Sequence, residues 1–296
     1  MKELLIGGNG LIGSYIPRDS SERKIVAPLQ KELDITSWIL TKKFFDRVRP
    51  DVVVHLAAQT GILKGEKERG NKKGLFWQVN VEGTKNIVEN CLRYNSYLVF
   101  ISAEVVFAGT KKRPGPYSEN DTPEENQDHL SWYGWTKVEA ERLIQKELPQ
   151  ASIVRLSSVV GRGEQPRPDY ARKILQAYDG GQLPSMFVDQ HIGLTDVDEF
   201  IIVLRKLVER RLSGIFHVAS LDQFSPFEFA NLLLEKTRGV KRMVKPGLIE
   251  DYLKKHPATF PQYSGLKTEK TQELLGVRFS SWKRIVDKIA PEIRQS

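Results

Sequence analysis

Short apolar runs alternate with helical stretches along the first half of the chain. Five of these runs are predicted to be buried strands: Leu4–Ile6, Lys24–Ala27, Asp51–Leu56, Leu98–Ile101 and Ser152–Leu156. Between them apolar residues recur at helical spacing, which predicts helices from about Leu11 and over Thr36–Val48, Val79–Tyr94 and Trp135–Leu148. Strands that are apolar on both faces need helices on both sides, so the pattern predicts an α/β fold with a doubly wound parallel sheet.

The pattern changes after about Gly161. Residues 161–184 are rich in Gly, Pro, Arg and Gln, and the remainder mixes short helices with isolated extended pieces. Gly214–Val218 is predicted to be a strand that returns to the main sheet, and Pro226–Thr237 a helix. We therefore expect a first domain over residues 1–160, to which segments at about 188–220 return. A smaller C-terminal substrate-binding lobe would consist mainly of residues 161–187 and 221–296.

Composition and charge narrow the class of protein. The 296 residues include 45 Lys and Arg against 37 Asp and Glu, a formal charge of +8. The basic residues form only short clusters such as Lys111–Arg113, which favours a solvated basic surface with a small anionic ligand over a nucleic-acid partner. Cys91 is the only cysteine, so no intrachain disulfide is expected. No apolar run approaches the ~20 residues that cross a bilayer, and we expect a soluble, cytoplasmic protein with no membrane partner.

A glycine-rich segment, Gly7-Gly8-Asn9-Gly10-Leu11-Ile12-Gly13, directly follows the first strand. Glycine at these positions lets a strand turn tightly into a helix and lets backbone approach a pyrophosphate, so the segment predicts a dinucleotide site on a Rossmann-type sheet. Sheets that prefer NAD usually carry an acid at the end of the second strand, where this chain has Ala27 and Pro28. Lys31 just beyond favours NADP if it faces a 2′-phosphate, and leaves NAD open if it is a solvated loop lysine.

A second motif, Tyr133-Gly134-Trp135-Thr136-Lys137, comes after the strand that ends near Ser102. Residues four apart share one face of a helix, so the Lys137 ammonium is expected to lie near the Tyr133 phenol. A nearby cation stabilises phenolate and lowers the pKa of a tyrosine, which makes it usable as an acid or base near neutral pH.

Together with these motifs, segments along nearly the whole chain resemble the extended short-chain dehydrogenase/reductase family, and within it the dTDP-4-dehydrorhamnose reductases. The matching segments are Leu33–Thr36, Pro50–Thr60, Asn80–Thr84, Val106–Thr110, Tyr117–Asp121, Asp189–Thr195 and Ser264–Lys270. The resemblance implies an NAD(P)-dependent oxidoreductase of the nucleotide-sugar epimerase/dehydratase group, with NADP or NAD as cofactor, a nucleotide-linked 4-keto sugar as substrate and no metal. It leaves a homodimer open.

The resemblance also implies roles for individual residues. Tyr133 would protonate the C4 oxygen of the sugar while hydride arrives from the nicotinamide, and Lys137 would bind the nicotinamide ribose. The remaining cofactor-binding residues would be the pyrophosphate turn (Gly7, Gly10, Leu11, Ile12 and Gly13), Lys31, the adenine-flanking Asp34 and Ile35, Ala57, Ala58 and Thr60 along the ribose and pyrophosphate, and Asn80 behind the site.

The departures from the family pattern all lie on the substrate side. Ala103 stands where the family has a threonine whose hydroxyl bonds the carbonyl being reduced, and Ile62-Leu63 and Ser158 replace a Val-Asp pair and a tryptophan. Ser102 or an ordered water would have to supply the missing hydrogen bond. Two alternatives therefore stay open: a nucleotide-sugar epimerase or dehydratase, and a catalytically weak dinucleotide-binding regulatory subunit.

Overall fold

The structure is a computed structural model and describes residues 1–16, 24–255 and 260–293. Its centre is a parallel sheet in which the described residues form six strands, in the order β2-β1-β3-β4-β5-β9. These strands are β1 (Lys2–Ile6), β2 (Lys24–Val26), β3 (Val52–His55), β4 (Tyr97–Ala103), β5 (Ser152–Leu156) and β9 (Gly214–Val218). The strand order reverses between β1 and β3, the point at which sheets of this type bind ligands beyond their carboxyl ends.

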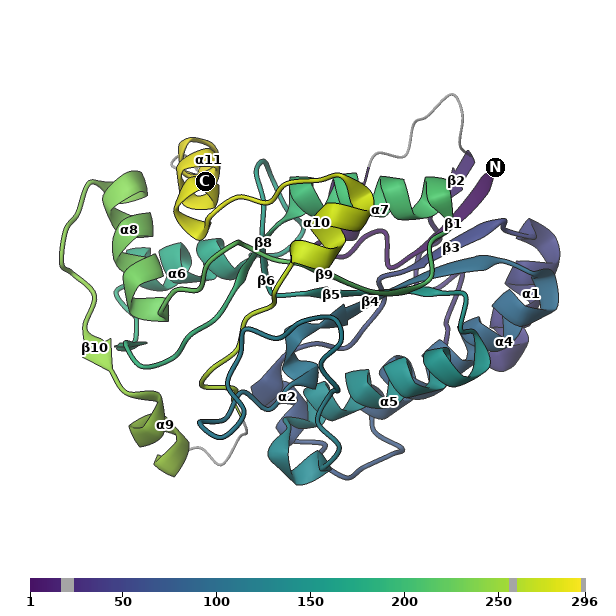
Figure 1. Ribbon diagram of the computed structural model, residues 1–296, viewed down its shortest axis with the longest axis horizontal. Coiled ribbons are helices and arrows are strands. Elements are labelled where there is room, and N and C mark those ends of the chain that lie inside the picture. The colour runs from purple at the N-terminus through teal and green to yellow at the C-terminus, as the bar shows by residue number, and fades with distance from the viewer. Residues whose placement is uncertain (17–23, 256–259, 294–296) are drawn as a thin grey trace.

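Helices cover both faces of the sheet (Figure 1). One face packs against α1 (Trp38–Val48), α4 (Thr84–Tyr94) and α5 (Trp132–Glu147), and the other against α7 (Val197–Arg210) and α10 (Glu269–Leu275). Along β4, Leu98 and Phe100 belong to the first core, whereas Val99 and Ile101 belong to the second. The expected doubly wound, Rossmann-type α/β fold is confirmed.

A second group of helices has a core of its own and lies beside the sheet (Figure 1). It consists of α6 (Tyr170–Asp179), α8 (Pro226–Arg238) and α11 (Trp282–Ile293). The described residues also form two short strand pairs, β6 (Ser158–Val160) with β8 (Leu194–Asp196) and β7 (Met186–Phe187) with β10 (Pro246–Gly247). Three short helices are α2 (Ile62–Glu66), α3 (Leu75–Trp77) and α9 (Ile249–Lys255). The C-terminal lobe is not built from one continuous segment, because α10 packs on the main sheet.

The helix predicted from about Leu11 is wrong for residues 11–16. The chain there forms a 3-10 turn at Gly13–Tyr15, and Ile16 is already extended, with φ −79° and ψ 115°. Pro17 explains this ending, because the proline ring clashes with a helical conformation of the residue before it. The rest of the expected helix lies in residues 17–23, outside the described residues. No helix in the described part of the chain is long and apolar enough to span a membrane.

Two other helices differ in detail from the prediction. The stretch expected to be helical from Val79 begins as a π-helix over Gln78–Gly83 and becomes regular only in α4. Such π-helical turns occur frequently at functional sites. Helix α5 begins at Trp132, three residues earlier than predicted, because the Ser131 hydroxyl caps it by accepting a hydrogen bond from the Gly134 N–H.

Candidate functional site

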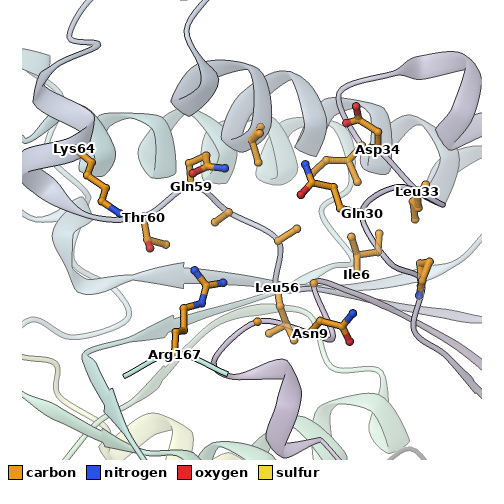
Figure 2. A pocket seen from close by; sticks show the side chains of 17 residues that line it. Ile6, Asn9, Gln30, Leu33, Asp34, Leu56, Gln59, Thr60, Lys64 and Arg167 are labelled. Atoms are coloured by element: carbon orange, nitrogen blue, oxygen red, sulfur yellow. The ribbon is translucent and has the colours of Figure 1, made fainter. Parts of the chain in front are cut away.

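A cavity of about 400 Å³ opens beyond the carboxyl ends of β1 and β3 (Figure 2). It lies at the point where the strand order reverses. Seven residues that the sequence assigns to cofactor binding line it: Gly7, Gly10, Asp34, Ile35, Ala57, Ala58 and Thr60. The tertiary structure thus brings together three segments that are far apart in the sequence.

The glycine turn forms the floor of this cavity and is closed by backbone contacts. Gly7 has φ +85°, and a Cβ atom there would lie 2.7 Å from the Ala57 nitrogen. A Cβ on Gly13 would lie 2.5 Å from the Gly7 oxygen, to which the Gly10 N–H donates a hydrogen bond of 2.9 Å. Gly7 and Gly13 are therefore required for the tightness of the turn, whereas Gly10 faces the cavity.

Other predicted residues lie outside the lining of the cavity. Leu11, Ile12 and Gly13 belong to the glycine turn but do not line the cavity. Lys31 is exposed and does not line it either, whereas its neighbour Gln30 does. The geometry therefore gives no support to contact between Lys31 and a 2′-phosphate.

Sequence reasoning missed five polar residues that do line the cavity, Asn9, Gln30, Gln59, Lys64 and Arg167. Asn9 and Gln30 adjoin motifs already singled out. Arg167, in contrast, comes from the irregular stretch after Gly161 and reaches the cavity only through the tertiary fold.

Asn80 is buried behind the cavity wall and holds it in place. Its amide oxygen accepts from the Gln59 N–H at 2.8 Å, and its amide nitrogen donates to the Gln59 oxygen at 3.0 Å and to the Thr136 hydroxyl at 2.9 Å. The Thr136 hydroxyl donates in turn to the Tyr133 carbonyl at 2.8 Å. The π-helix thus joins the loop that carries Ala57–Thr60 to the first turn of α5.

Helix α5 approaches the end of β4 closely at Gly134, where a Cβ atom would lie 2.3 Å from the Val105 oxygen. This close approach sets the position of Tyr133 and Lys137. The Lys137 ammonium donates to the Ile101 carbonyl at 2.7 Å and lies 4.0 Å from the centre of the Phe100 ring. Burial lowers the pKa of Lys137 to about 7, opposed by the nearby Glu141 carboxylate.

The expected lowering of the Tyr133 pKa is wrong for this structure. Burial raises the pKa of Tyr133 to about 12, and it is the single cause of the shift. The Tyr133 ring packs edge-on against Phe76, with 6.3 Å between the ring centres. The phenol is therefore protonated at neutral pH, which suits a proton donor.

The end of β4 carries Ala103, one of the residues that differ from the family pattern, directly after Ser102. Ser102 is buried, and its hydroxyl has no hydrogen-bond partner among the described residues. By strand alternation Ser102 shares the face of Phe100, on the side of α5, while Ala103 faces the other way. The chain then bends into a 3-10 turn at Glu104–Val106.

Glu104 occupies a buried position at this bend. Its carboxylate accepts from the Ser157 hydroxyl at 2.8 Å and from the Gly265 N–H at 3.2 Å. Burial raises the pKa of Glu104 to about 7, although these hydrogen bonds oppose the shift. No group of three or more His, Cys, Asp or Glu side chains in the described part of the chain is placed to hold a metal ion.

Comparison with known proteins shows which family the chain belongs to. Residues 1–295 match the family model of the RmlD substrate binding domain. The chain belongs to this family. It is 26% identical to a dTDP-4-dehydrorhamnose reductase of Aggregatibacter actinomycetemcomitans over 97% of each chain. It is also 24% identical to a methionine adenosyltransferase 2 subunit beta of Xenopus tropicalis, over 97% of this chain and 89% of that one.

Solved structures agree with this family membership. The crystal structure of a dTDP-4-dehydrorhamnose reductase from Bacillus anthracis str. Ames in complex with NADP superposes with a TM-score of 0.84 at 25% identity. That match covers 97% of this chain and 98% of the other. The resemblance drawn from the sequence motifs is therefore confirmed for the family and for the fold.

Proposed function

We propose that this protein is an oxidoreductase that reduces the C4 ketone of a nucleotide-linked 4-keto sugar, with NADPH or NADH as the hydride donor. The observation that carries the proposal is the combination of a glycine-floored cavity at the strand reversal with the Tyr133–Lys137 pair on α5, in a chain that matches its family over residues 1–295. The relatives of this chain include dTDP-4-dehydrorhamnose reductases, one of them crystallised with NADP.

The cavity fits a dinucleotide in shape and in polarity. The positive φ of Gly7 and the absence of a side chain at Gly10 leave room for a diphosphate against the backbone. Asp34 lies at one end of the cavity, and Thr60 lies towards the other (Figure 2). A bound dinucleotide would supply a hydride and, after transfer, a positive charge on its oxidised ring.

The residues of this chain would carry the proton. Hydride adds to the carbonyl carbon while the Tyr133 hydroxyl gives its proton to the carbonyl oxygen, so the ketone becomes an alcohol and the phenol becomes phenolate. Because the pKa of Tyr133 is about 12, its proton is present at neutral pH. The Lys137 ammonium, held over Phe100 by the Ile101 carbonyl, would orient the ribose of the cofactor.

The test is substrate-dependent oxidation of NADPH and NADH with dTDP-4-dehydrorhamnose, followed in wild type and in Tyr133→Phe. We expect turnover in wild type and a loss of roughly 10²–10⁴-fold in the variant, the usual contribution of a general acid. The affinity for NADPH should stay the same in both, because the diphosphate is bound elsewhere. Equal turnover in the two proteins would contradict the role of Tyr133.

Two observations favour a second candidate, a dinucleotide-binding subunit without turnover of its own. Ala103 supplies no hydroxyl at the end of β4, and the chain is also similar to a methionine adenosyltransferase 2 subunit beta. Wild-type protein that binds NADPH but oxidises it with no 4-keto sugar of a nucleotide-linked panel would favour this candidate over the reductase.

A further inference from the structure

In the described residues, the glycine turn is not followed by the helix that usually comes next. In sheets of this type the diphosphate of a dinucleotide lies at the N-terminus of that helix, whose aligned peptide dipoles and free N–H groups attract negative charge. Here the turn leads only into the 3-10 turn Gly13–Tyr15, and Ile16 is extended. A turn of this length has little dipole to offer, so the positive charge for a diphosphate has to come from elsewhere.

Arg167 is placed to supply that charge. A Cβ atom on Gly10 would lie 3.4 Å from the guanidinium of Arg167, and both residues line the cavity. Figure 2 shows the guanidinium reaching in from the side opposite the loop that carries Thr60, with the Lys64 ammonium at the same end of the cavity. Asp34 is the one acid among the described lining residues, and it lies at the other end of this view.

The charge of Arg167 has no partner among the described residues. The Arg167 side chain is exposed, and no hydrogen bond or ion pair joins it to another described residue. Other arginines of the same segment are paired: Arg162 with Asp198 at 2.9 Å, and Arg172 with Asp169 at 2.7 Å. Arg167 is therefore distinguished from its neighbours by facing the cavity without a carboxylate.

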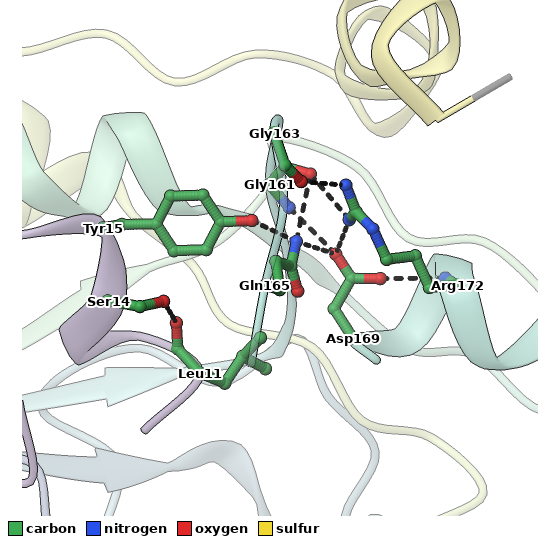
Figure 3. Close-up of polar contacts among 8 residues, drawn as sticks. All are labelled: Leu11, Ser14, Tyr15, Gly161, Gly163, Gln165, Asp169 and Arg172. Carbon is green, nitrogen blue, oxygen red and sulfur yellow. Dashed lines mark hydrogen bonds and ion pairs between the residues drawn. The ribbon is translucent and has the colours of Figure 1, made fainter. Parts of the chain in front are cut away.

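The loop that carries Arg167, residues 161–169, contacts Tyr15, the last residue of the 3-10 turn that follows the glycine turn (Figure 3). The Gln165 amide donates to the Tyr15 hydroxyl and, at 2.9 Å, to the Asp169 carboxylate. A Cβ atom on Gly161 would lie 2.6 Å from the Tyr15 ring, so the start of the loop also rests on this side chain.

Arg172 fixes the same loop from its other side. Its guanidinium donates to the Gly161 carbonyl at 2.9 Å and to the Gly163 carbonyl at 2.5 Å, in addition to its ion pair with Asp169. Between these anchors the sequence Pro166-Arg167-Pro168 restricts the backbone on both sides of the arginine. A side chain carried on a backbone that is already ordered loses less entropy when it binds.

We propose that Arg167 binds the diphosphate of the dinucleotide from the loop of residues 161–169, in place of a helix N-terminus, which the described residues after the glycine turn do not form. A guanidinium suits this role because its planar N–H groups match two phosphate oxygens at once. Tyr15 and Gln165 act as positioning residues that hold the Arg167 loop over the glycine turn. This inference rests on the dinucleotide binding of the proposed function and names the residues that provide it.

The experiment compares the binding of NADPH and of adenosine 2′-monophosphate, which lacks the diphosphate, by calorimetric titration. We expect Arg167→Ala to weaken NADPH at least about tenfold, the size of one lost charge-assisted contact, and to leave adenosine 2′-monophosphate within twofold. Arg167→Lys should recover part of the NADPH affinity, because it restores the charge without the planar geometry.

Matched controls separate this role from a structural one. Arg162→Ala removes another exposed arginine of the same loop, outside the cavity, and should leave NADPH affinity unchanged. The melting temperature of Arg167→Ala without ligand should equal that of wild type, because Arg167 makes no bond within the described protein. Tyr15→Phe should weaken NADPH through the loop while retaining the fold.

Each outcome decides between the proposals. NADPH affinity in Arg167→Ala within twofold of wild type, or an equal loss for adenosine 2′-monophosphate, overturns the inference and leaves the reductase standing. Binding that depends on Arg167 in a protein without turnover supports the inference and overturns the reductase. A wild-type protein that binds neither NADPH nor NADH overturns both.

Discussion

Replacement of Asn80 by alanine tests whether the wall of the cavity is held from behind. Asn80 is 1% exposed and makes three side-chain hydrogen bonds, two to the backbone of Gln59 and one to Thr136. A hydrogen bond contributes about 1 kcal/mol net, so Asn80→Ala should cost about 3 kcal/mol of folding free energy. For a chain of this size that corresponds to a fall of roughly 5–10 °C in melting temperature.

The same substitution should release the loop that carries Ala57–Thr60. With Gln59 no longer fixed, we expect the dissociation constant for NADPH to rise about tenfold, which is about 1.4 kcal/mol. The assay is calorimetric titration at a temperature at which both proteins are folded, with melting followed by circular dichroism.

Asn90→Ala is the matched control for this experiment. Asn90 is also buried and donates to the Asn86 carbonyl at 2.8 Å, but it lies outside the cavity lining. The control should lose stability and keep its affinity for NADPH. The reasoning is refuted if Asn80→Ala binds NADPH as wild type does, or if the control loses affinity by the same factor.

Three further substitutions probe the region around β4 and α5. Burial raises the pKa of Glu104 to about 7, so its contribution to folding stability falls as pH rises from about 4.5 to 7. Glu104→Gln should therefore be about 3 kcal/mol more stable than wild type near pH 8 and equally stable near pH 4. Denaturant titrations that give the same stability difference at both pH values would contradict this. Ala103→Thr puts a hydroxyl at the position where the family pattern has a threonine, and should raise kcat about tenfold on a 4-keto sugar. Unchanged kcat in a folded, NADPH-binding variant would reject the missing-donor explanation. Gly134→Ala forces a methyl group against the Val105 oxygen. It should lower the folding stability by about 1–3 kcal/mol and should also lower turnover. Normal turnover would show that this close approach does not position Tyr133.

The sequence predicts the sheet well because its strands are short, apolar and bounded by turn residues. The predicted Ser152–Leu156 and Gly214–Val218 have the bounds that the structure shows. The error near Leu11 has a local cause. The glycine motif alone suggests a full helix, but Pro17 disfavours a helical conformation at Ile16, which is extended.

Tertiary structure decides the parts of the site that the sequence could not reveal. Nothing in the sequence around Arg167 indicates that it faces Gly10, because the contact depends on how the loop of residues 161–169 packs on Tyr15. The pKa of Tyr133 likewise depends on burial by surrounding segments, which outweighs the expected effect of Lys137. Spacing along one helix indicates which residues share a face, but it does not describe their surroundings.

The most direct test of the proposed reaction is the transfer of deuterium from the nicotinamide C4 of labelled NADPH to the sugar, measured by mass spectrometry of the product formed from dTDP-4-dehydrorhamnose. We predict that wild type places one deuterium at C4 of the sugar. Tyr133→Phe should do so at least roughly 10²-fold more slowly while binding NADPH with equal affinity. Wild-type protein that binds NADPH yet yields no deuterated sugar, or a Tyr133→Phe variant that transfers deuterium at the wild-type rate, would contradict the account.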